Sequence, residues 1–425
     1  MRISGKVGFL IIRDRYGTTQ CFLGKEMIEK AKDIRRESVL RVKGEVKERP
    51  DNQKKKEQAT GEIELSVKEL EVLSPADPLP LELDESVAST EETRLKYRYL
   101  DLRKPRMQRN LELRSRIIKA IRDYFADNGF IDIETPVLAK STPEGARDYL
   151  VPSRINKGAF YALPQSPQIF KQLSMIACFD KYVQIPKCYR DEDLRADRQP
   201  EFTQLDVEMS FIEEEDVFKT IEEMMKRVFK DAMKVDLKTP FPRMTYKEAM
   251  ERYKSDKPKV GNEKWNFIWI VDFPMFEKNE QGRVTFTHHP FTMPVFDKLE
   301  DITSKPLELG SRGYDLVLNG VELGSGSIRI HRNDIQEKVF QAIGLSKEEY
   351  EEKFGFFLGA LRYGTPPHGG IALGLDRFCA LLAGEESIRE VVAFPKTKDA
   401  EDLMLESPSK VSDEQLSELG LRAGK

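Results

Sequence analysis

The chain has few cysteines and no long apolar run. Its four cysteines are scattered over 425 residues without a CxxC spacing, which argues against a disulfide framework and against a zinc site. No stretch approaches the roughly 18 apolar residues of a membrane-spanning helix, and the apolar run at residues 7–12 is too short for the core of a signal peptide. These features predict a soluble protein of the reducing cytoplasm, without a membrane partner.

Charged residues are abundant instead and make up 33% of the chain, against 39% hydrophobic residues. At this length, such a composition allows two or three domains with a sizeable core. The net charge of -4 argues against a protein that coats nucleic acid. Residues 1–75, however, hold 17 Lys and Arg against 13 Asp and Glu, a net +4, which leaves -8 for the rest. A basic module that touches a nucleic acid fits this distribution, and so does ordinary scatter.

Residues 1–75 alternate short strand-like segments with turn residues and contain one helix-like insert, at residues 25–36. The predicted strands are residues 7–12, 18–22, 38–47 and 62–73. Several strands with one helix predict a small OB-type barrel, a fold on which aromatic side chains stack bases. Because a Pro-rich run follows at residues 74–80, we predict a linker over residues 76–108 and a second domain over residues 109–425.

Two charged segments of the second domain indicate its chemistry. Residues 188–211, CYRDEDLRADRQPEFTQLDVEMSF, place arginines and acids between strand-like segments, which suits a polyanion that needs a guanidinium on its phosphate. Residues 370–377, GIALGLDR, combine one arginine with glycines that let the backbone approach a ligand closely. Upstream, a helix predicted at residues 111–128 precedes an alternating strand at residues 130–135 and Pro136.

These segments resemble motifs 2, 3 and 1 of the class II aminoacyl-tRNA synthetases, and most closely the bacterial type of aspartyl-tRNA synthetase. The resemblance implies an α+β catalytic domain around an antiparallel sheet, preceded by an OB-fold anticodon-binding domain. It also implies a homodimer with motif 1 at the subunit contact. The activity implied is ATP-dependent, Mg²⁺-assisted activation of L-aspartate to aspartyl-adenylate. The aspartyl group would then pass to the 3′ end of tRNA(Asp), with tRNA(Asn) left open as a second substrate.

The resemblance assigns ATP to side chains of these motifs. Arg190 would hold the α-phosphate and the attacking carboxylate, because its planar fork can bind two oxygens while charge builds up. Adenine would lie between Phe202 and Arg377, in a stacking and cation–π arrangement. The implied ATP contacts are Arg190, Glu192, Gln199, Phe202, Glu322, Gly374, Asp376 and Arg377, with Arg190 and Arg377 also as catalytic residues. Each alone would be typical of a surface ion pair or a core position, so their joint order carries the interpretation.

A hairpin is predicted near residue 319, because Asn319-Gly320 is a strong turn signal between two strand-like segments. Asp315 and Glu322 would then face each other and, as the resemblance implies, bind Mg²⁺ that bridges the ATP phosphates. Without the family, the same acids read more simply as charged side chains on a solvated face.

Selection of aspartate needs a fixed cation, because the second carboxylate of the substrate must be desolvated. Gln168 and Lys171 would share one face of a helix that starts after Pro167. In aspartyl enzymes the lysine and arginine that match Lys171 and Arg329 hold that carboxylate, so an amide would leave a buried cation unpaired. The resemblance assigns to aspartate Glu144, Gln168, Lys171, Asp206, His288 and Arg329. Among them, Asp206 would receive the α-ammonium group and Glu144 would sit on a loop that closes over the substrate.

Anticodon recognition would fall to Phe9, Gln20 and Phe22, two rings to stack bases and an amide to read a base edge. Two phenylalanines in strands are also typical of a core. The chain departs from the family in three respects. A first barrel strand and the insertion domain after motif 2 are expected to be missing, and Ser325 stands where the family has a glycine.

Two other functions stay open. A synthetase-like paralogue could amidate aspartate through the same adenylate with ammonia, a reaction that needs no anticodon reader. An inactive paralogue could bind RNA or regulate, although drift of that kind usually removes Arg190, Asp315, Glu322 and Arg377, which are all present. Aspartate-dependent exchange of pyrophosphate into ATP, followed by charging of tRNA, separates the three.

Overall fold

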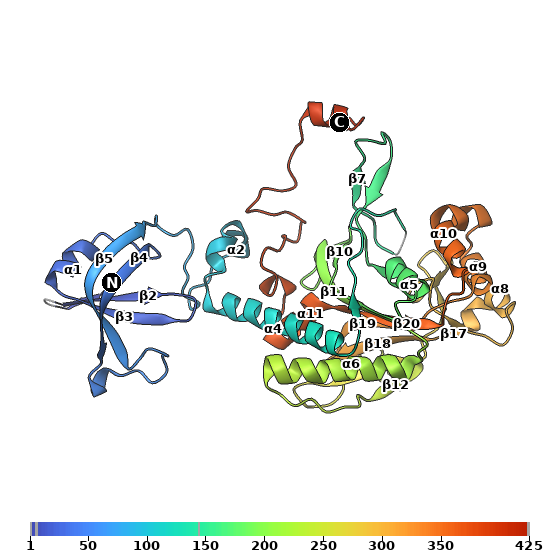
Figure 1. The fold of residues 1–425 in the computed structure, drawn as a ribbon. Helices are drawn as coiled ribbons and strands as arrows, with labels where there is room; N and C mark the ends of the chain where they lie inside the picture. The colour runs from blue at the N-terminus through green and yellow to red at the C-terminus, as the bar shows by residue number, and fades with distance from the viewer. Residues whose placement is uncertain (1, 5–6, 143–144, 423–425) are drawn as a thin grey trace. The chain divides into compact units, whose positions relative to one another are not determined.

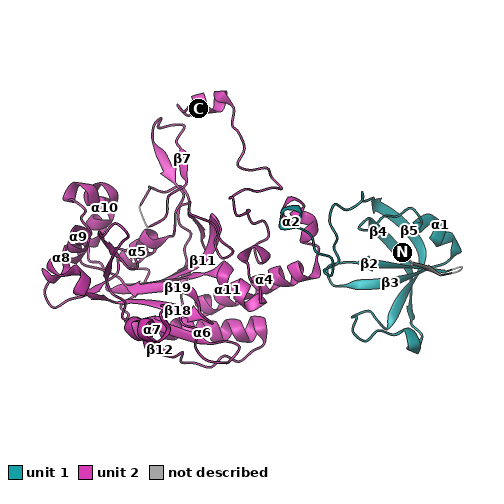
Figure 2. Ribbon diagram, turned by 180° about the vertical axis from the view of Figure 1, so that it is seen from behind, with its two compact units in different colours: residues 1–93 teal, residues 94–425 magenta. Residues whose placement is uncertain are grey.

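The structure is a computed structural model that describes residues 2–4, 7–142 and 145–422, without the side chains of residues 2–4. It divides into two compact units, Met1–Thr93 and Arg94–Lys425 (Figure 2). The predicted linker of residues 76–108 is therefore shared between the two units. None of the described helices is both long and apolar enough to span a membrane.

The first unit is a five-stranded sheet with the strand order β1-β2-β3-β5-β4. Its elements are β1 (Arg2–Ser4), β2 (Val7–Arg13), β3 (Thr18–Leu23), α1 (Lys25–Ala31), β4 (Val39–Glu48) and β5 (Ile63–Ser74). Among the described strands of this unit, only β3 and β5 pair in parallel. Leu10, Cys21, Leu23 and Met27 form its core with Val67. The arrangement is the predicted OB-type barrel, and its first described strand, β1, is three residues long.

The second unit is built on a nine-stranded, mostly antiparallel sheet with the order β12-β13-β18-β19-β20-β11-β9-β6, in which β10 also pairs with β11 (Figure 1). Only the β12–β13 and β6–β9 pairings are parallel. Its strands are β6 (Ile131–Asp132), β9 (Lys181–Gln184), β10 (Lys187–Tyr189), β11 (Glu201–Ser210), β12 (Arg243–Thr245), β13 (Phe267–Val271), β18 (Gly313–Leu318), β19 (Val321–Ile328) and β20 (His368–Gly374). The sheet and its helices make the predicted α+β domain.

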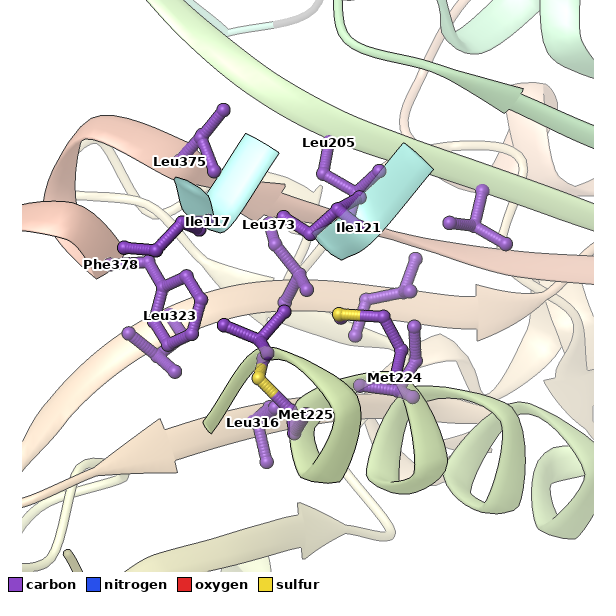
Figure 3. Packing of buried hydrophobic residues seen from close by; sticks show 14 of the residues in the cluster. Ile117, Ile121, Leu205, Met224, Met225, Leu316, Leu323, Leu373, Leu375 and Phe378 are labelled. Carbon is purple, nitrogen blue, oxygen red and sulfur yellow. The ribbon is translucent and has the colours of Figure 1, made fainter. Parts of the chain in front are cut away.

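Three helices cover one face of this sheet and form the main core with it (Figure 3). They are α4 (Pro105–Asp127), α6 (Glu214–Val228) and α11 (Leu375–Ala383). The other long helices, α5 (Gln168–Ile176), α9 (Asn333–Ala342) and α10 (Lys347–Leu361), contribute to a separate cluster around Phe291. Shorter elements are α2 (Glu91–Lys96), α3 (Arg98–Asp101), β7 (Leu150–Pro152), β8 (Phe160–Ala162), α7 (Tyr246–Tyr253), β14 (Phe276–Lys278), β15 (Val284–Phe286), β16 (Pro294–Val295), α8 (Asp301–Ser304), β17 (Gly310–Ser311) and α12 (Asp413–Glu418).

The central strand β11 explains how a polar site forms on a fully packed sheet. Successive side chains of a strand point to opposite faces. Leu205, Val207 and Met209 belong to the core with α4, α6 and α11, whereas the alternate residues Asp206 and Glu208 point to the opposite face. That face meets α5, because Lys171 of α5 contacts both acids. Because side chains alternate along β11, this one strand contributes residues both to the hydrophobic core and to the polar site.

The predicted strand at residues 130–135 is much shorter than expected. Only Ile131 and Asp132 pair, in parallel, with β9 at the edge of the sheet. Pro136 cannot donate a ladder hydrogen bond, so the strand cannot continue through it. Ile131, Val137 and Leu138 are left 45–53% exposed along this edge.

Candidate functional site

A cavity of about 740 Å³ opens in the second unit where the β10–β11 loop meets the β18–β19 hairpin and the start of α11. All eight residues predicted to contact ATP line it, and so do Gln168, His288 and Arg329 from the predicted aspartate site. Lys171, Asp206 and Asp315 lie behind this wall, fully or almost fully buried. Glu144 lies outside the described residues. Segments far apart in the sequence thus converge on one cavity.

Arg190 and Phe202 are brought together by strand pairing, because β10 and β11 are antiparallel neighbours with Tyr189 opposite Glu201. The Arg190 guanidinium lies 5.0 Å from the centre of the Phe202 ring, within cation–π range. Its buried Nε has no hydrogen-bond partner among the described residues. The guanidinium is therefore held in the cavity by a ring and keeps donor capacity for an anion.

Arg377 is engaged differently from the predicted adenine sandwich. Its Nη1 donates to the backbone oxygen of Glu322 at 2.8 Å, and its Nη2 pairs with Asp197 at 3.1 Å. The ring of Phe202 meets Arg190 instead. Phe202 and Arg377 both line the cavity, and the adenine sandwich between them stays a prediction.

Gln199 and Asp376 are occupied by contacts within the protein. The Gln199 amide exchanges two hydrogen bonds with the backbone of Lys396, at 2.8 and 3.1 Å. Asp376 accepts from the backbone N–H of Thr203 at 2.8 Å and pairs with Arg114 at 2.5 Å. These contacts fix the ends of the 190–202 loop against α4, α11 and the C-terminal segment. Both residues line the cavity, but their described hydrogen bonds and ion pairs are made with other parts of the protein that form its walls.

Beneath the cavity lies a buried group of two cations and two acids. Lys171 Nζ lies 2.9 Å from Asp206 Oδ1 and 3.5 Å from Glu208 Oε2. Arg329 grips Glu208 with two parallel hydrogen bonds of 2.9 and 3.2 Å. All four side chains are at most 1% exposed. Glu208 was not among our predicted residues, although its alternation with Asp206 along the strand could have indicated it.

The two acids of this group differ in how firmly they are ionised. Burial raises the pKa of Asp206, and the charge and hydrogen bond of Lys171 only partly oppose the rise. Burial would raise the pKa of Glu208 too, but the charges of Arg329 and Lys171 outweigh it and lower that pKa. Oδ2 of Asp206 is buried and has no hydrogen-bond partner in the described part of the chain. An incoming ammonium group would satisfy that oxygen and favour its charged form.

Two adjacent histidines, the predicted His288 and its neighbour His289, lie in different parts of the site. His288 Nε2 lies 3.0 Å from Asp315, and its ring meets Phe273 edge-on at 4.6 Å. His289 Nε2 lies 2.5 Å from Nη1 of Arg329. Burial, followed by the charge of Arg329, holds the pKa of His289 well below its usual value, so the ring is neutral. The sequence had placed His288 on the amino acid, whereas the structure sets His289 beside Arg329 and His288 beside the hairpin acids.

The predicted hairpin is present, with Asn319 and Gly320 both at positive φ between β18 and β19. The two acids do not stand directly opposite each other. Asp315 pairs with Ser325, and Glu322 pairs with Val317 across an irregularity in the register. The acids are still coupled: burial and the charge of Glu322 both raise the pKa of Asp315. Ser325, the register partner of Asp315, helps to lower that pKa through its hydroxyl.

The hairpin acids suit Mg²⁺ as a donor set. Carboxylate oxygens are hard ligands, and protein magnesium sites usually combine one or two carboxylates with substrate phosphates. In the described part of the chain, no group of three or more His, Cys, Asp or Glu side chains is placed to hold a metal ion, so binding without a nucleotide would depend on the two hairpin acids and be weak. Glu322 instead pairs with Lys257 at 2.8 Å, a residue that our sequence analysis did not single out. The phosphates of a nucleotide would complete the ligand set.

The glycines around the buried group are required by close packing. A Cβ at Gly370 would overlap the carbonyl oxygen of Val207 and a carboxylate oxygen of Glu208. We expect Gly370→Ala to lower the free energy of unfolding by about 2 kcal/mol or more, measured by chemical denaturation. Gly374→Ala on the same strand is the matched control, since its Cβ would meet nothing closer than 3.6 Å. Equal stability of both variants would contradict the packing argument.

The predicted anticodon residues share one face of the barrel. Phe9 and Phe22 are register partners on β2 and β3, with ring centres 5.9 Å apart in an edge-to-face contact. Gln20 lies on the same face and donates to Glu64 at 2.9 Å. All three are partly exposed, whereas the alternate residues Leu10 and Cys21 are buried. The two rings therefore form a partly exposed pair on the surface of the barrel and do not belong to its core.

Comparisons with known proteins cover the whole chain. Residues 90–398 match the family model described as tRNA synthetases class II (D, K and N), and residues 1–73 match the OB-fold nucleic acid binding domain. An aspartate–tRNA(Asp/Asn) ligase of Thermotoga maritima is 43% identical, with 99% of this chain and 95% of that relative covered. One from Syntrophomonas wolfei is 41% identical, with 99% and 94% covered.

Solved structures share the fold. Asparaginyl-tRNA synthetase of Pyrococcus horikoshii, in complex with asparaginyl-adenylate, has a TM-score of 0.74 at 23% identity, with 93% of this chain and 92% of that chain covered. A putative aspartyl-tRNA synthetase of Leishmania major also has a TM-score of 0.74, at 21% identity, with 93% and 88% covered. The alignment with the Thermotoga maritima protein runs over 553 positions, so at least 128 of them have no counterpart among the 425 residues of this chain. This deficit agrees with the predicted lack of an insertion domain.

Proposed function

This chain belongs to the class II tRNA synthetases of the D, K and N type, and within them to the bacterial-type aspartyl-tRNA synthetases, and on that basis we propose that it is an aspartate–tRNA ligase. It activates L-aspartate with ATP and passes the aspartyl group to tRNA(Asp) and to tRNA(Asn), the two tRNAs in its relatives' names. The observation that carries the proposal is the convergence of Arg190, Arg377 and the hairpin acids on one cavity above the buried group of Lys171 and Arg329.

Activation requires the aspartate carboxylate to attack the α-phosphate of ATP, so two anions must meet. Arg190 supplies the charge that makes this approach favourable, since a planar guanidinium can bind an oxygen of each partner. Its contact with the Phe202 ring holds it in place before the substrates arrive. The developing negative charge on the α-phosphate is thus stabilised by a preorganised donor, which is where such donors lower a barrier most.

Aspartate is selected by the buried group. The α-ammonium group binds Asp206, whose free oxygen Oδ2 needs a donor. The side-chain carboxylate binds Arg329 and Lys171, which both contact Glu208. Neutral His289 beside Arg329 adds no charge of its own to the place where that carboxylate binds. An amide in this place would leave a buried cation short of its counter-charge.

Asp315 and Glu322 are the proposed ligands of Mg²⁺. The ion would neutralise charge on the triphosphate and so reduce its electrostatic repulsion of the attacking carboxylate. His288 and Ser325 orient Asp315 through their hydrogen bonds. This division of labour agrees with the placing of His288 at the hairpin rather than at the amino acid.

We expect Glu322→Gln to raise the Mg²⁺ concentration needed for half-maximal pyrophosphate exchange by at least about tenfold, because the neutral amide is a poorer magnesium ligand than the carboxylate. The measurement is a magnesium titration of the exchange rate at fixed ATP. The exposed acid Glu277 on β14 gives the matched control, Glu277→Gln. An unshifted magnesium curve for Glu322→Gln would remove this residue from the metal site.

Two further parts of the function are proposals that rest on exposed surfaces. Phe9 and Phe22 stack anticodon bases and Gln20 reads a base edge, supported by their common, partly exposed face. A homodimer forms through the edge strand β6, supported by the exposed apolar side chains Ile131, Val137 and Leu138.

Aspartate-dependent exchange of pyrophosphate into ATP, followed by charging of tRNA, tests the function. We expect exchange with aspartate, much weaker exchange with asparagine, and then charging of both tRNAs. Absence of exchange would point to an inactive paralogue. Exchange without charging, together with ammonia-dependent formation of asparagine, would point to an amidating enzyme.

A further inference from the structure

Lys257 lies in the segment of residues 254–266, which connects α7 directly to β13. Its ammonium group is 2.8 Å from Oε2 of Glu322, and the residue lines the cavity together with Arg190 and Arg377. Its side chain is 42% exposed, while that of Glu322 is 27% exposed. A partly exposed lysine thus lines the cavity and forms an ion pair with the acid that is proposed to bind metal.

The segment is packed onto the hairpin and does not hang in solvent. The backbone N–H of Lys257 donates to the Ser255 hydroxyl at 3.0 Å, and Pro258 beside it is buried. A Cβ at Gly320 would lie 3.2 Å from Cβ of Lys259 and 3.7 Å from the carbonyl oxygen of Lys257. The backbone of Lys257 therefore lies against the hairpin turn, and from there its side chain can reach both Glu322 and the adjoining cavity.

We propose that Lys257 is a phosphate-binding residue of the ATP site, which pairs with Glu322 in the ligand-free enzyme and competes there with the metal. This inference rests on the proposed function. Glu322 has one carboxylate, and its partner in the free protein is Lys257. A metal ligand must be released from a competing ammonium group before it can bind a divalent ion.

The released ammonium group has an evident destination. Lysine is a compact charge on a four-carbon stem, and in many nucleotide sites it binds phosphate as a point charge. Five arginines also line the cavity, and Lys257 adds a cation from the segment packed on the hairpin turn; the arginines are Arg190, Arg195, Arg198, Arg329 and Arg377. When Glu322 binds the metal, the released Lys257 would thus supply a positive charge to the ATP triphosphate.

The test uses Lys257→Met in the full chain, for which the two halves of the proposal predict opposite shifts. The KM for ATP in pyrophosphate exchange should rise roughly tenfold or more, since a charged hydrogen bond to phosphate is lost. The variant should also bind Mn²⁺ severalfold more tightly in the absence of substrates, because the competing ammonium group is gone. Electron paramagnetic resonance of the free ion measures this binding. Lys257→Arg should restore much of the ATP affinity.

Lys259→Met is the matched control, because Lys259 is exposed, lies two residues away and does not line the cavity. It should change neither the KM for ATP nor Mn²⁺ binding. A weakening of both properties in Lys257→Met would indicate a purely structural ion pair and overturn the proposal, and so would an unchanged KM for ATP. Mn²⁺ binding needs no catalysis. If the wild-type protein fails in aspartate-dependent exchange, that result counts against the proposed function, and the Mn²⁺ measurement still tests the competition between Lys257 and the metal.

Discussion

Replacing Arg190 by glutamine is expected to lower kcat for aspartate-dependent pyrophosphate exchange by about a hundredfold to a thousandfold. Loss of one preorganised donor to a developing negative charge has an effect of this size in other enzymes. The free energy of unfolding should change little, because the described contacts of the guanidinium are limited to one ring at 5.0 Å. Glutamine keeps a polar side chain of similar length and removes the charge and the fork.

The ratio of the kinetic constants makes this prediction sharper. An interaction made mainly in the transition state lowers kcat and kcat/KM by similar factors, whereas lost ground-state binding raises KM alone. Arg122→Gln on α4 is the control, since Arg122 is exposed and forms only a long ion pair of 3.7 Å with Asp132. A loss of less than about tenfold in kcat for Arg190→Gln, or an equal loss in the control, would take Arg190 out of the reaction.

Much of the fold could be read from local patterns. In the barrel, turn residues and alternation placed the strands within a residue or two, for example residues 18–22 against Thr18–Leu23. Asn319-Gly320 predicted its hairpin correctly, because few other dipeptides adopt positive φ at two successive positions so readily. The helix at residues 111–128 begins earlier, at Pro105, since proline is favoured in a first helical turn and the apolar spacing did not extend to it.

Partnerships between buried side chains could not be read in the same way. Alternation along β11 indicates which residues share a face, but it does not say that Lys171 approaches both Asp206 and Glu208. The contact depends on how α5 packs against the sheet, which is a tertiary property. Likewise the two adjacent histidines diverge to Asp315 and Arg329 because the backbone turns between them, and no sequence pattern ranks one above the other.

The short loop at Lys257 is a further example of what local patterns miss. Its residues look like an ordinary charged connection in the sequence. Only the packing of that connection on Gly320 brings the lysine to Glu322, more than sixty residues away in the chain. Long-range placement of this kind depends on how the connection between α7 and β13 packs, which is a tertiary property.

Lys171→Met is expected to lower kcat/KM for aspartate by about a hundredfold to a thousandfold, because truncating one partner of a buried, hydrogen-bonded charge pair commonly costs 2–5 kcal/mol. It should also lower the free energy of unfolding, since Lys171 is fully buried between two acids and its loss leaves Asp206 without its cation. Loss of activity alone would therefore be ambiguous. Denaturation curves must show that the variant is folded under the conditions of the kinetic assay.

The discrimination between aspartate and asparagine resolves that ambiguity. A purely structural lysine would weaken activation of both amino acids by the same factor, and would weaken ATP binding too. A lysine that binds the substrate carboxylate penalises asparagine, so its removal should leave the weak use of asparagine nearly unchanged while the use of aspartate falls. The ratio of the two kcat/KM values should then shrink by about the same factor as aspartate activation itself. If the ratio stays constant in a folded Lys171→Met variant, the lysine only neutralises Asp206 and Glu208, and selection of aspartate falls to Arg329 and His289.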